Sequence, residues 1–263
     1  MSEPVLYAVD GGVATITLNR PDAMNGLDVP SKVALRDAVL RAAGDDDVRV
    51  VVLAGSGRAF CVGQDLKEHI GLLRSGDTGT LFSTVEEHYN PTVTALLTMA
   101  KPVVAAVNGV AAGAGASLAL ACDFRVLVDT AGFNFAFAGV GLSCDTGVSW
   151  TLPRIVGRAK ATELLYFPRT VDASESLTLG LATSVVPADG FEPAVTELAG
   201  KLAAGPTLAY GAMKRAMNTS ATSELPEALA FEGRMMNLTG ATEDHHRAVE
   251  SFVAKEKPVF SGR

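Results

Sequence analysis

Polar and apolar residues alternate in some parts of the chain and recur every three to four positions in others, which predicts strands and helices in turn. Residues 5–18 alternate around Asp10-Gly11-Gly12, a pattern typical of a β-hairpin with a tight turn. The short apolar runs at 50–53 and 103–107 are typical of strands buried on both faces of a parallel sheet. Further strands are expected at 123–128, 133–137 and 185–187, and helices at 31–42, 65–73, 81–99, 145–152 and 174–180, with one more ending at 121. Ser31 and Ser174 are the expected N-caps of two of these helices.

Strands and helices alternate as far as about residue 190, after which only helical spacing continues to about residue 254. Such alternation predicts an α/β fold. We therefore expect an α/β core over 1–190 and a helical C-terminal region over 191–263.

Residues 102–122 carry no charge and are nearly long enough to cross a membrane as a helix. Asn108 and several glycines interrupt the run, and its filler is mostly alanine, which inserts weakly. A buried strand followed by a buried helix explains the same run, and we adopt that interpretation.

The composition of the chain excludes several classes of binding partner and site. Hydrophobic residues make up 48% of the 263 residues, which is ample for a buried core. The 22 basic and 29 acidic side chains give a formal charge of 22 − 29 = −7 with no basic run, which argues against nucleic acid or a membrane as a partner. Cys61, Cys122 and Cys144 show no CxxC spacing, so no metal site or disulfide framework is expected. The N-terminus lacks a secretory signal, and we expect a cytoplasmic protein.

The first candidate for chemistry is the Ala- and Gly-rich segment 108–117, which joins a predicted strand to a predicted helix. Amides at a helix start are unpaired and lie at the positive end of its dipole, so they can bind a phosphate or an oxyanion. The alternative is that small residues here only allow tight packing. Phosphate-loop and dinucleotide patterns fail, because no Lys-Ser/Thr pair and no third glycine follow. A hydrolase triad of Ser117 with His245 or His246 is disfavoured, because Ser117 falls inside the helix rather than on the turn before it.

Two further segments carry candidate groups. A glycine again precedes a helix start at 63–65, so two loops could aim two amides at one carbonyl oxygen; the alternative is a plain N-cap at Asp65. Asp145 is an acid in otherwise uncharged surroundings, and burial there would raise its pKa and suit it to proton transfer. The alternative for Asp145 is the N-cap of the helix predicted to run toward Leu152.

Four segments together make the sequence recognisable. They are Leu18-Asn19-Arg20-Pro21, residues 59–66, residues 101–109 and Cys122-Asp123-Phe124. In this order they resemble the crotonase superfamily, also called the enoyl-CoA hydratase/isomerase family, over essentially the whole chain. The resemblance implies a spiral of ββα units, a helical C-terminal trimerisation region, and homotrimers or dimers of trimers. It also implies an acyl-CoA thioester as substrate, with coenzyme A as part of the substrate rather than a separate cofactor.

The resemblance assigns roles by motif position. The backbone amides of Gln64 and Ala114 would stabilise a thioester enolate. The two glutamates with which hydratases of the family add water fall on Ser117 and Phe137, so water addition by that pair is doubtful. Asp145 falls where isomerases of the superfamily carry a catalytic aspartate.

The expected activity is therefore an acyl-CoA isomerase in which Asp145 removes a proton and returns it two carbons away. The sequence looks most like the isomerase type of phenylacetate breakdown, which rearranges ring 1,2-epoxyphenylacetyl-CoA to oxepin-CoA and also shifts double bonds in enoyl-CoA. Alternatives are an enoyl-CoA hydratase of fatty-acid β-oxidation and a non-catalytic acyl-CoA-binding protein. Predicted substrate contacts are Cys61, Gly63, Asp65, Leu66, Lys67, Gly113, Ser117, Phe137, Leu142 and Trp150.

Overall fold

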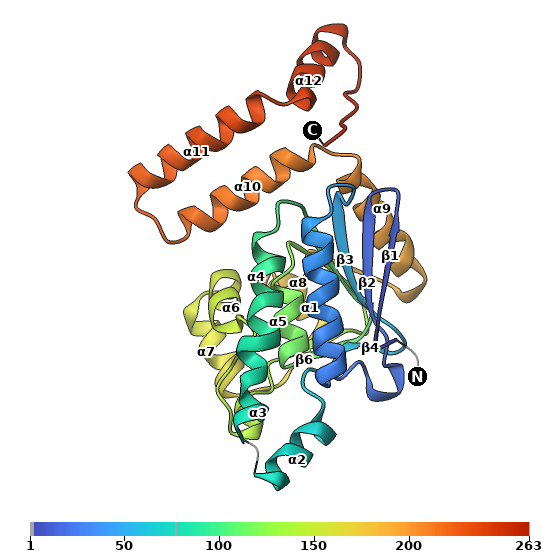
Figure 1. Ribbon diagram of the computed structural model, residues 1–263, viewed down its shortest axis with the longest axis vertical. Helices are drawn as coiled ribbons and strands as arrows, with labels where there is room; N and C mark the ends of the chain where they lie inside the picture. The colour runs from blue at the N-terminus through green and yellow to red at the C-terminus, as the bar shows by residue number, and fades with distance from the viewer. Residues whose placement is uncertain (1–2, 77, 263) are drawn as a thin grey trace.

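A six-stranded sheet in the order β1-β2-β3-β5-β7-β10 forms the centre of the computed structural model, which describes residues 3–76 and 78–262 (Figure 1). Its strands are β1 (Val5–Asp10), β2 (Val13–Leu18), β3 (Val50–Gly55), β5 (Val103–Val107), β7 (Phe124–Val128) and β10 (Ser184–Val186). β1 and β2 are antiparallel and the other neighbours are parallel. The predicted hairpin is confirmed: Gly11 and Gly12 take φ values of +53° and +80°, which a two-residue turn of this hand requires.

The apolar run of β3 is continuous because both faces of the strand are buried. Val51 and Leu53 belong to the main core cluster, whereas Val50 and Val52 pack with Leu202 on the other face. Helices α1 (Val29–Gly44), α4 (Asn90–Thr98) and α5 (Ala114–Leu120) cover the first face, and α9 (Phe191–Ala203) covers the second (Figure 1). The α/β prediction is thus confirmed.

A smaller four-stranded sheet has the order β4-β6-β8-β9. Its strands are β4 (Ala59–Cys61), β6 (Val110–Ala112), β8 (Gly132–Asn134) and β9 (Thr170–Asp172). Sequence analysis missed β4, β6 and β9, because three residues are too few to show an alternation. The strand predicted over 133–137 was too long, since the chain leaves the sheet after Asn134 and Phe137 precedes the 3-10 turn η3 (Ala138–Val140).

Three predicted helix starts were misplaced. Asp28, not Ser31, caps α1, accepting a hydrogen bond from the Ser31 amide at 3.0 Å. Asp172, not Ser174, caps α8 (Ala173–Thr178). Helix α6 (Val148–Val156) begins after Gly147, so Asp145 is not its N-cap.

The helix predicted over 81–99 is three segments. Helix α3 (Thr78–Thr84) leads into the π-helical turn η2 (Val85–Tyr89), which leads into α4. Before them, α2 (Leu66–Ser75) starts as predicted at Asp65, whose carboxylate accepts the Lys67 and Glu68 amides at 2.9 and 3.3 Å. Helix α7 (Arg158–Tyr166) follows α6 and buries Ala161 and Leu164.

The uncharged segment 102–122 forms β5, β6 and α5, and every residue of α5 is buried. Within residues 3–76 and 78–262, no helix combines the length and apolar character needed to cross a bilayer.

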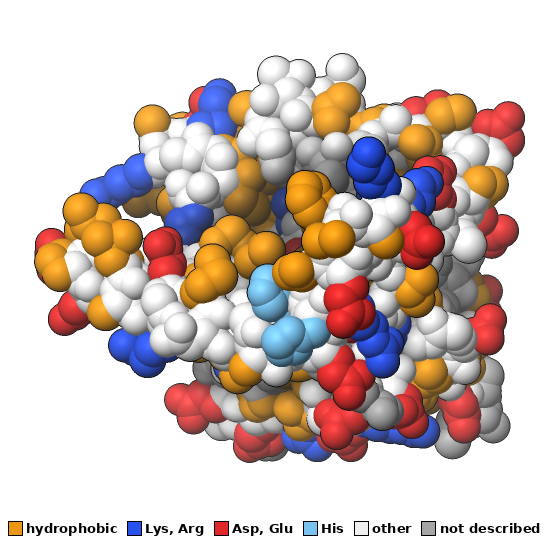
Figure 2. Space-filling model, turned by 90° about the horizontal axis from the view of Figure 1, so that it is seen from above, with side chains coloured by type: hydrophobic (Ala, Val, Ile, Leu, Met, Phe, Trp, Pro, Cys, Tyr) orange, Lys and Arg blue, Asp and Glu red, His pale blue; other side chains and the backbone are white. Residues whose placement is uncertain are grey.

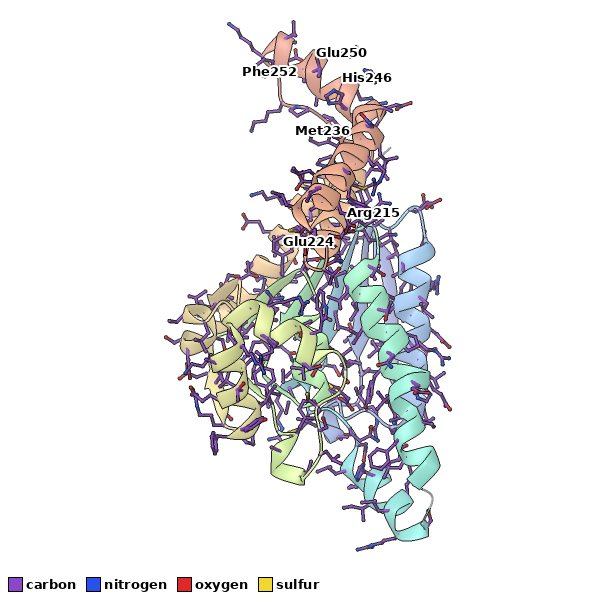
Figure 3. The ribbon with its side chains drawn as sticks, turned by 90° about the vertical axis from the view of Figure 1, so that its left-hand side faces the viewer. Arg215, Glu224, Met236, His246, Glu250 and Phe252 are labelled. Atoms are coloured by element: carbon purple, nitrogen blue, oxygen red, sulfur yellow. The ribbon has the colours of Figure 1, made fainter. Side chains whose placement is uncertain are left out.

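Helices α10 (Thr207–Ser220), α11 (Leu225–Gly240) and α12 (Glu243–Ala254) form a C-terminal arm that extends away from the sheets (Figures 1 and 3). The ammonium of Lys214 ties α10 to the core through Asp123 at 2.8 Å and the Leu96 carbonyl at 2.7 Å. The segment after α12 folds back, because the buried carboxylate of Asp244 accepts the amides of Ser261 and Gly262 at 2.6 and 2.8 Å. The domain boundary expected at residue 190 stays a prediction, and α9, which follows it, packs on the sheet.

Candidate active site

A cavity of about 420 Å³ lies where the three segments singled out in the sequence meet. Its walls come from α2, α3 and η2, from the start of α5, and from residues 136–145. Most of the lining is apolar. Seven of the predicted site residues line it: Gln64, Leu66, Gly113, Ala114, Phe137, Leu142 and Asp145.

Two backbone amides are available at this cavity. Leu27 pairs with the chain at Gln64 by donating to the Gly63 carbonyl (2.8 Å) and accepting from the Asp65 amide (3.1 Å). In such a parallel pairing the amide of Gln64 itself faces away from Leu27. Ala114 is the first residue of α5, so no carbonyl of its helix lies four residues before it. Both amides can therefore donate to a ligand.

Gly63 brings the two amides together. It has a φ of +82°, and a Cβ atom at this position would lie 3.1 Å from the Ala114 nitrogen and 2.9 Å from the Ala112 carbonyl oxygen. A side chain would therefore push the two loops apart. Gly63 is not in the cavity lining, and its contribution is to let the two loops approach each other closely.

Asp145 is the carboxylate that lines the cavity. Burial raises the pKa of Asp145, and the hydrogen bond that its Oδ1 accepts from the Thr146 hydroxyl (2.8 Å) opposes that rise in part. Thr146 is buried with a φ of +53°, a left-handed conformation that a β-branched residue rarely adopts. Strain of this kind gathers at functional sites, which supports a chemical role for the neighbouring acid.

Tyr89 is a site residue that sequence analysis missed. It falls in the helix predicted over 81–99 and was given no role, but it is 3% exposed and its hydroxyl donates to Gln64 Oε1 at 2.8 Å. Burial first, and the negative charge of Asp145 second, hold the pKa of Tyr89 well above its ordinary value. Tyr89 therefore contacts the side chain of Gln64, lines the cavity, and is close enough to Asp145 to respond to its charge.

Three residues predicted to contact the substrate are not in the cavity lining, and their side chains have other contacts. Ser117 is fully buried and donates to the Gly113 carbonyl at 3.1 Å, inside α5. Cys61 is also fully buried, and burial raises the pKa of its thiol to about 12. The ring of Trp150 packs against the Arg154 guanidinium, whose Cζ atom lies 4.0 Å from the ring centroid.

Two more predicted contacts lie outside the cavity lining. Asp65 is engaged as the cap of α2 and in an ion pair with Arg20 at 2.9 Å. Lys67 is exposed on α2, and a role in holding the phosphates of coenzyme A stays a prediction.

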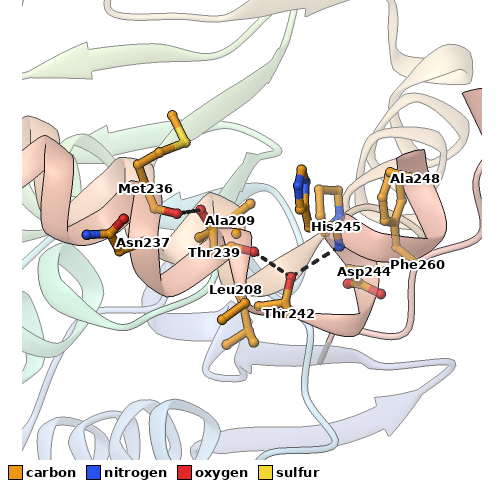
Figure 4. A pocket seen from close by; sticks show the side chains of 13 residues that line it. Leu208, Ala209, Met236, Asn237, Thr239, Thr242, Asp244, His245, Ala248 and Phe260 are labelled. Atoms are coloured by element: carbon orange, nitrogen blue, oxygen red, sulfur yellow. Dashed lines mark hydrogen bonds between the residues drawn. The ribbon is translucent and has the colours of Figure 1, made fainter. Parts of the chain in front are cut away.

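The C-terminal arm holds a second hollow of about 660 Å³, shown in Figure 4. Thr242 accepts the His245 amide at 3.2 Å and donates to the Thr239 carbonyl at 2.7 Å. The carboxylate in this lining, Asp244, is already occupied by the amides of the folded-back segment. His245 lines this hollow and His246 is exposed on α12, whereas Ser117 is buried in α5, so the hydrolase triad is not assembled.

Comparison with known proteins gives one consistent family. The sequence profile described as Enoyl-CoA hydratase/isomerase matches residues 8–263. The chain is 38% identical over 263 residues to the 1,2-epoxyphenylacetyl-CoA isomerase of Escherichia coli K12, covering 100% of both chains. It is 39% identical over 259 residues to a Rhodobacter capsulatus protein named as a probable enoyl-CoA hydratase, covering 98% of each. A solved structure from Mycobacterium abscessus, 43% identical, superposes with a TM-score of 0.95 and covers 98% of this chain and 100% of that one.

Proposed function

The chain belongs to the enoyl-CoA hydratase/isomerase family, and on that premise we propose that it is an acyl-CoA isomerase in which Asp145 transfers the proton. The observation that carries this proposal is the pairing of one carboxylate with two free amides in one cavity. At the two positions expected for hydratase glutamates, Ser117 is buried in α5 and Phe137 is apolar. A single acid is the arrangement that suits proton removal and return.

The mechanism follows from these groups. The thioester oxygen accepts hydrogen bonds from the amides of Gln64 and Ala114. The Asp145 carboxylate takes a proton from the α or γ carbon, and the electron pair moves onto the thioester oxygen as an enolate. The protonated Asp145 then returns the proton two carbons away, which shifts the double bond. Preorganised donors of this kind each contribute roughly 10²–10³ in rate.

The name of the Escherichia coli relative points to one substrate class. We propose that ring 1,2-epoxyphenylacetyl-CoA, rearranged to oxepin-CoA, is a substrate alongside 3-enoyl-CoAs. The apolar lining around Phe137 and Leu142 suits an aromatic or alkenyl group without charge.

Replacing Asp145 by asparagine tests the proposal. Because Asp145→Asn keeps the shape of the acid but cannot take a proton, turnover of 3-enoyl-CoA should fall roughly 10²–10⁴-fold while acyl-CoA binding persists. Asp129→Asn, the same change at an exposed acid, is the matched control and should keep full turnover. Normal turnover by Asp145→Asn would contradict the proposal.

A hydratase is the second candidate, because the Rhodobacter relative carries that name. Mixing the protein with crotonyl-CoA and following the enoyl absorbance decides between the two. Loss of absorbance with formation of the 3-hydroxyacyl product would favour the hydratase. Tight binding of every enoyl and epoxide thioester without turnover would instead favour a non-catalytic carrier.

We also propose that the protein assembles as a homotrimer or a dimer of trimers through the C-terminal arm. Apolar side chains gather on this arm, as Figure 2 shows, and Figure 3 shows Met236 and Phe252 on its helices. The most exposed of them include Met217, Leu225, Met236, Phe252 and Val253. Sedimentation of the wild type and of a Met236→Glu variant tests this, and a monomeric wild type would contradict it.

A further inference from the structure

The side chain of Gln64 contacts three other polar side chains, those of Lys32, Glu68 and Tyr89. We propose that Lys32, with Glu68 and Tyr89, is a positioning group that fixes the Gln64 amide for oxyanion binding. This inference rests on the oxyanion site of the proposed function. The sequence motifs gave none of these three residues a role.

The carboxamide of Gln64 is held at both ends. Its Oε1 accepts from the Tyr89 hydroxyl at 2.8 Å and from the Lys32 ammonium at 3.3 Å. Its Nε2 donates to Glu68 Oε1 at 3.3 Å, and Lys32 donates to the same oxygen at 3.2 Å. Lys32, Gln64 and Glu68 thus form a closed triangle, and Glu68 Oε2 also accepts the Val29 amide at 2.9 Å.

The burial of Lys32 shows that the triangle has a defined geometry. Lys32 is 2% exposed, and a buried ammonium is costly unless its hydrogen bonds are satisfied. Its side chain comes from α1, which packs against the large sheet, whereas Glu68 belongs to α2, which has no buried residue. The triangle therefore links Gln64, which precedes the unburied helix α2, to the packed body of the protein.

Tyr89 reaches this cluster because of the π-helical turn η2. The wider turn rotates the helix between α3 and α4 and ends at Tyr89, which is buried. Such turns occur often at functional sites, where they aim a side chain inward. The Lys32 ammonium also lies 5.9 Å from the Tyr89 ring centroid, so the two donors to Gln64 Oε1 support each other.

The chemical consequence concerns the direction of one N–H group. Rotation of the Gln64 peptide would turn its amide away from the thioester oxygen, and small misplacements of a catalytic donor are costly in rate. With both ends of the carboxamide fixed, the peptide is held before substrate arrives. The expected signature is a loss of enolate stabilisation with retention of ground-state binding.

The experiment compares Lys32→Met and Tyr89→Phe with the control Lys160→Met, which removes a surface lysine paired with Glu163. The probe is acetoacetyl-CoA, whose bound enolate is followed by its ultraviolet absorbance. Butyryl-CoA, which does not enolise appreciably, reports ground-state affinity. We expect the enolisation constant to fall roughly 10-fold or more in Lys32→Met and roughly three- to tenfold in Tyr89→Phe, with butyryl-CoA affinity within about threefold.

An enolisation constant equal to that of the wild type in both variants would overturn the inference. An equal loss of affinity for acetoacetyl-CoA and butyryl-CoA would also overturn it, because a merely structural role predicts that result. If Lys32→Met does not fold, Tyr89→Phe, which removes one oxygen atom, decides alone. A wild-type protein without an enolate signal would remove the oxyanion site and this inference with it. A protein that enolises acetoacetyl-CoA but isomerises no enoyl-CoA disproves the proposed activity and leaves the inference standing.

Discussion

Two helices begin at the proposed oxyanion site, and they are fixed there by different forces. All seven residues of α5 are buried, and Gly115 packs against the backbone of Cys61 with no room for a side chain. Helix α2 has no buried residue, and Figure 1 shows it at the end of the molecule opposite the C-terminal arm. Its start is held by the Asp65 cap, the Arg20 ion pair and the Lys32–Gln64–Glu68 triangle.

The contrast shows that an amide that donates to the same oxygen can be held in position either by side-chain packing or by charged and capping groups. Packing depends on volume and, in α5, involves no charged or titrating side chain. Charge and capping depend on protonation and screening. The two helix starts should therefore respond to different perturbations.

The largest difference is expected from adding one methyl group to each helix. In Gly115→Ala the new Cβ would overlap the Cys61 carbonyl group, 2.7 Å from its carbon, so we expect a loss of about 1–3 kcal/mol in the free energy of unfolding and a loss of turnover. Gly71→Ala, in α2, meets nothing within 4 Å and should stabilise that helix by roughly 0.5–1 kcal/mol. Urea denaturation measures the first and hydrogen exchange the second. Equal tolerance at both positions would break the contrast.

A smaller effect is expected from removing the cap of α2. Asp65→Ala removes the acceptor for two amides and the partner of Arg20, so the amides of α2 should exchange roughly five- to tenfold faster, with those of α5 unchanged. Turnover should also fall, since Gln64 adjoins the cap. Asp172→Ala, which removes the cap of α8, is the matched control and should leave turnover intact.

Acid should loosen α2 before α5. Burial alone would raise the pKa of Asp65, but hydrogen bonds from Arg20 and from the amides of Glu68 and Lys67 outweigh it and lower the pKa. A carboxylate with a lowered folded pKa stabilises the fold above its unfolded value, about 3.9, and this stabilisation is lost as the pH falls through the folded pKa. Pepsin cleavage within α2 should therefore increase below about pH 4. In Asp65→Asn this pH dependence should disappear.

The smallest effect is expected from salt. Raising the ionic strength from about 0.05 to about 1 M shortens the screening length to roughly 3 Å. The partly exposed Arg20–Asp65 pair should weaken by less than about 1 kcal/mol, so exchange in α2 should rise only a few-fold. Amides of α5 serve as the internal control, and an equal rise there would show that packing does not distinguish the two helices.

The elements that could be predicted from sequence are those whose own residues carry the signal. Strand β3 shows a continuous apolar run because both of its faces are buried. The turn between β1 and β2 could be predicted because the two adjacent glycines Gly11 and Gly12 are typical of it. The three-residue strands β4, β6 and β9 of the small sheet carry no such signal. The helix starts at Asp28 and Asp172 were misplaced by two or three residues, because serines nearby are equally good caps.

The candidate site divides in the same way. Two glycine-rich segments and an isolated acid marked the candidate regions, and the family resemblance then assigned roles to Gln64, Ala114 and Asp145. The cavity brings these three residues together. Lys32 and Tyr89 were missed because each meets Gln64 only through the fold, from sequence separations of 32 and 25 residues. Trp150 was assigned by its apolar character, which does not show that Arg154 covers its ring.

The two proposed oxyanion donors at Gln64 and Ala114 are backbone groups, and this affects how the site can change through evolution. No substitution deletes a peptide N–H except a change to proline, so the donors persist when side chains change, and at position 64 such changes alter only how firmly the amide is positioned. New activities in such a scaffold are therefore expected to arise by exchange of the acid and the cavity wall. The inherited part of the chemistry is a backbone shape, and its trace in related sequences should be the glycine at position 63 rather than the residue at position 64.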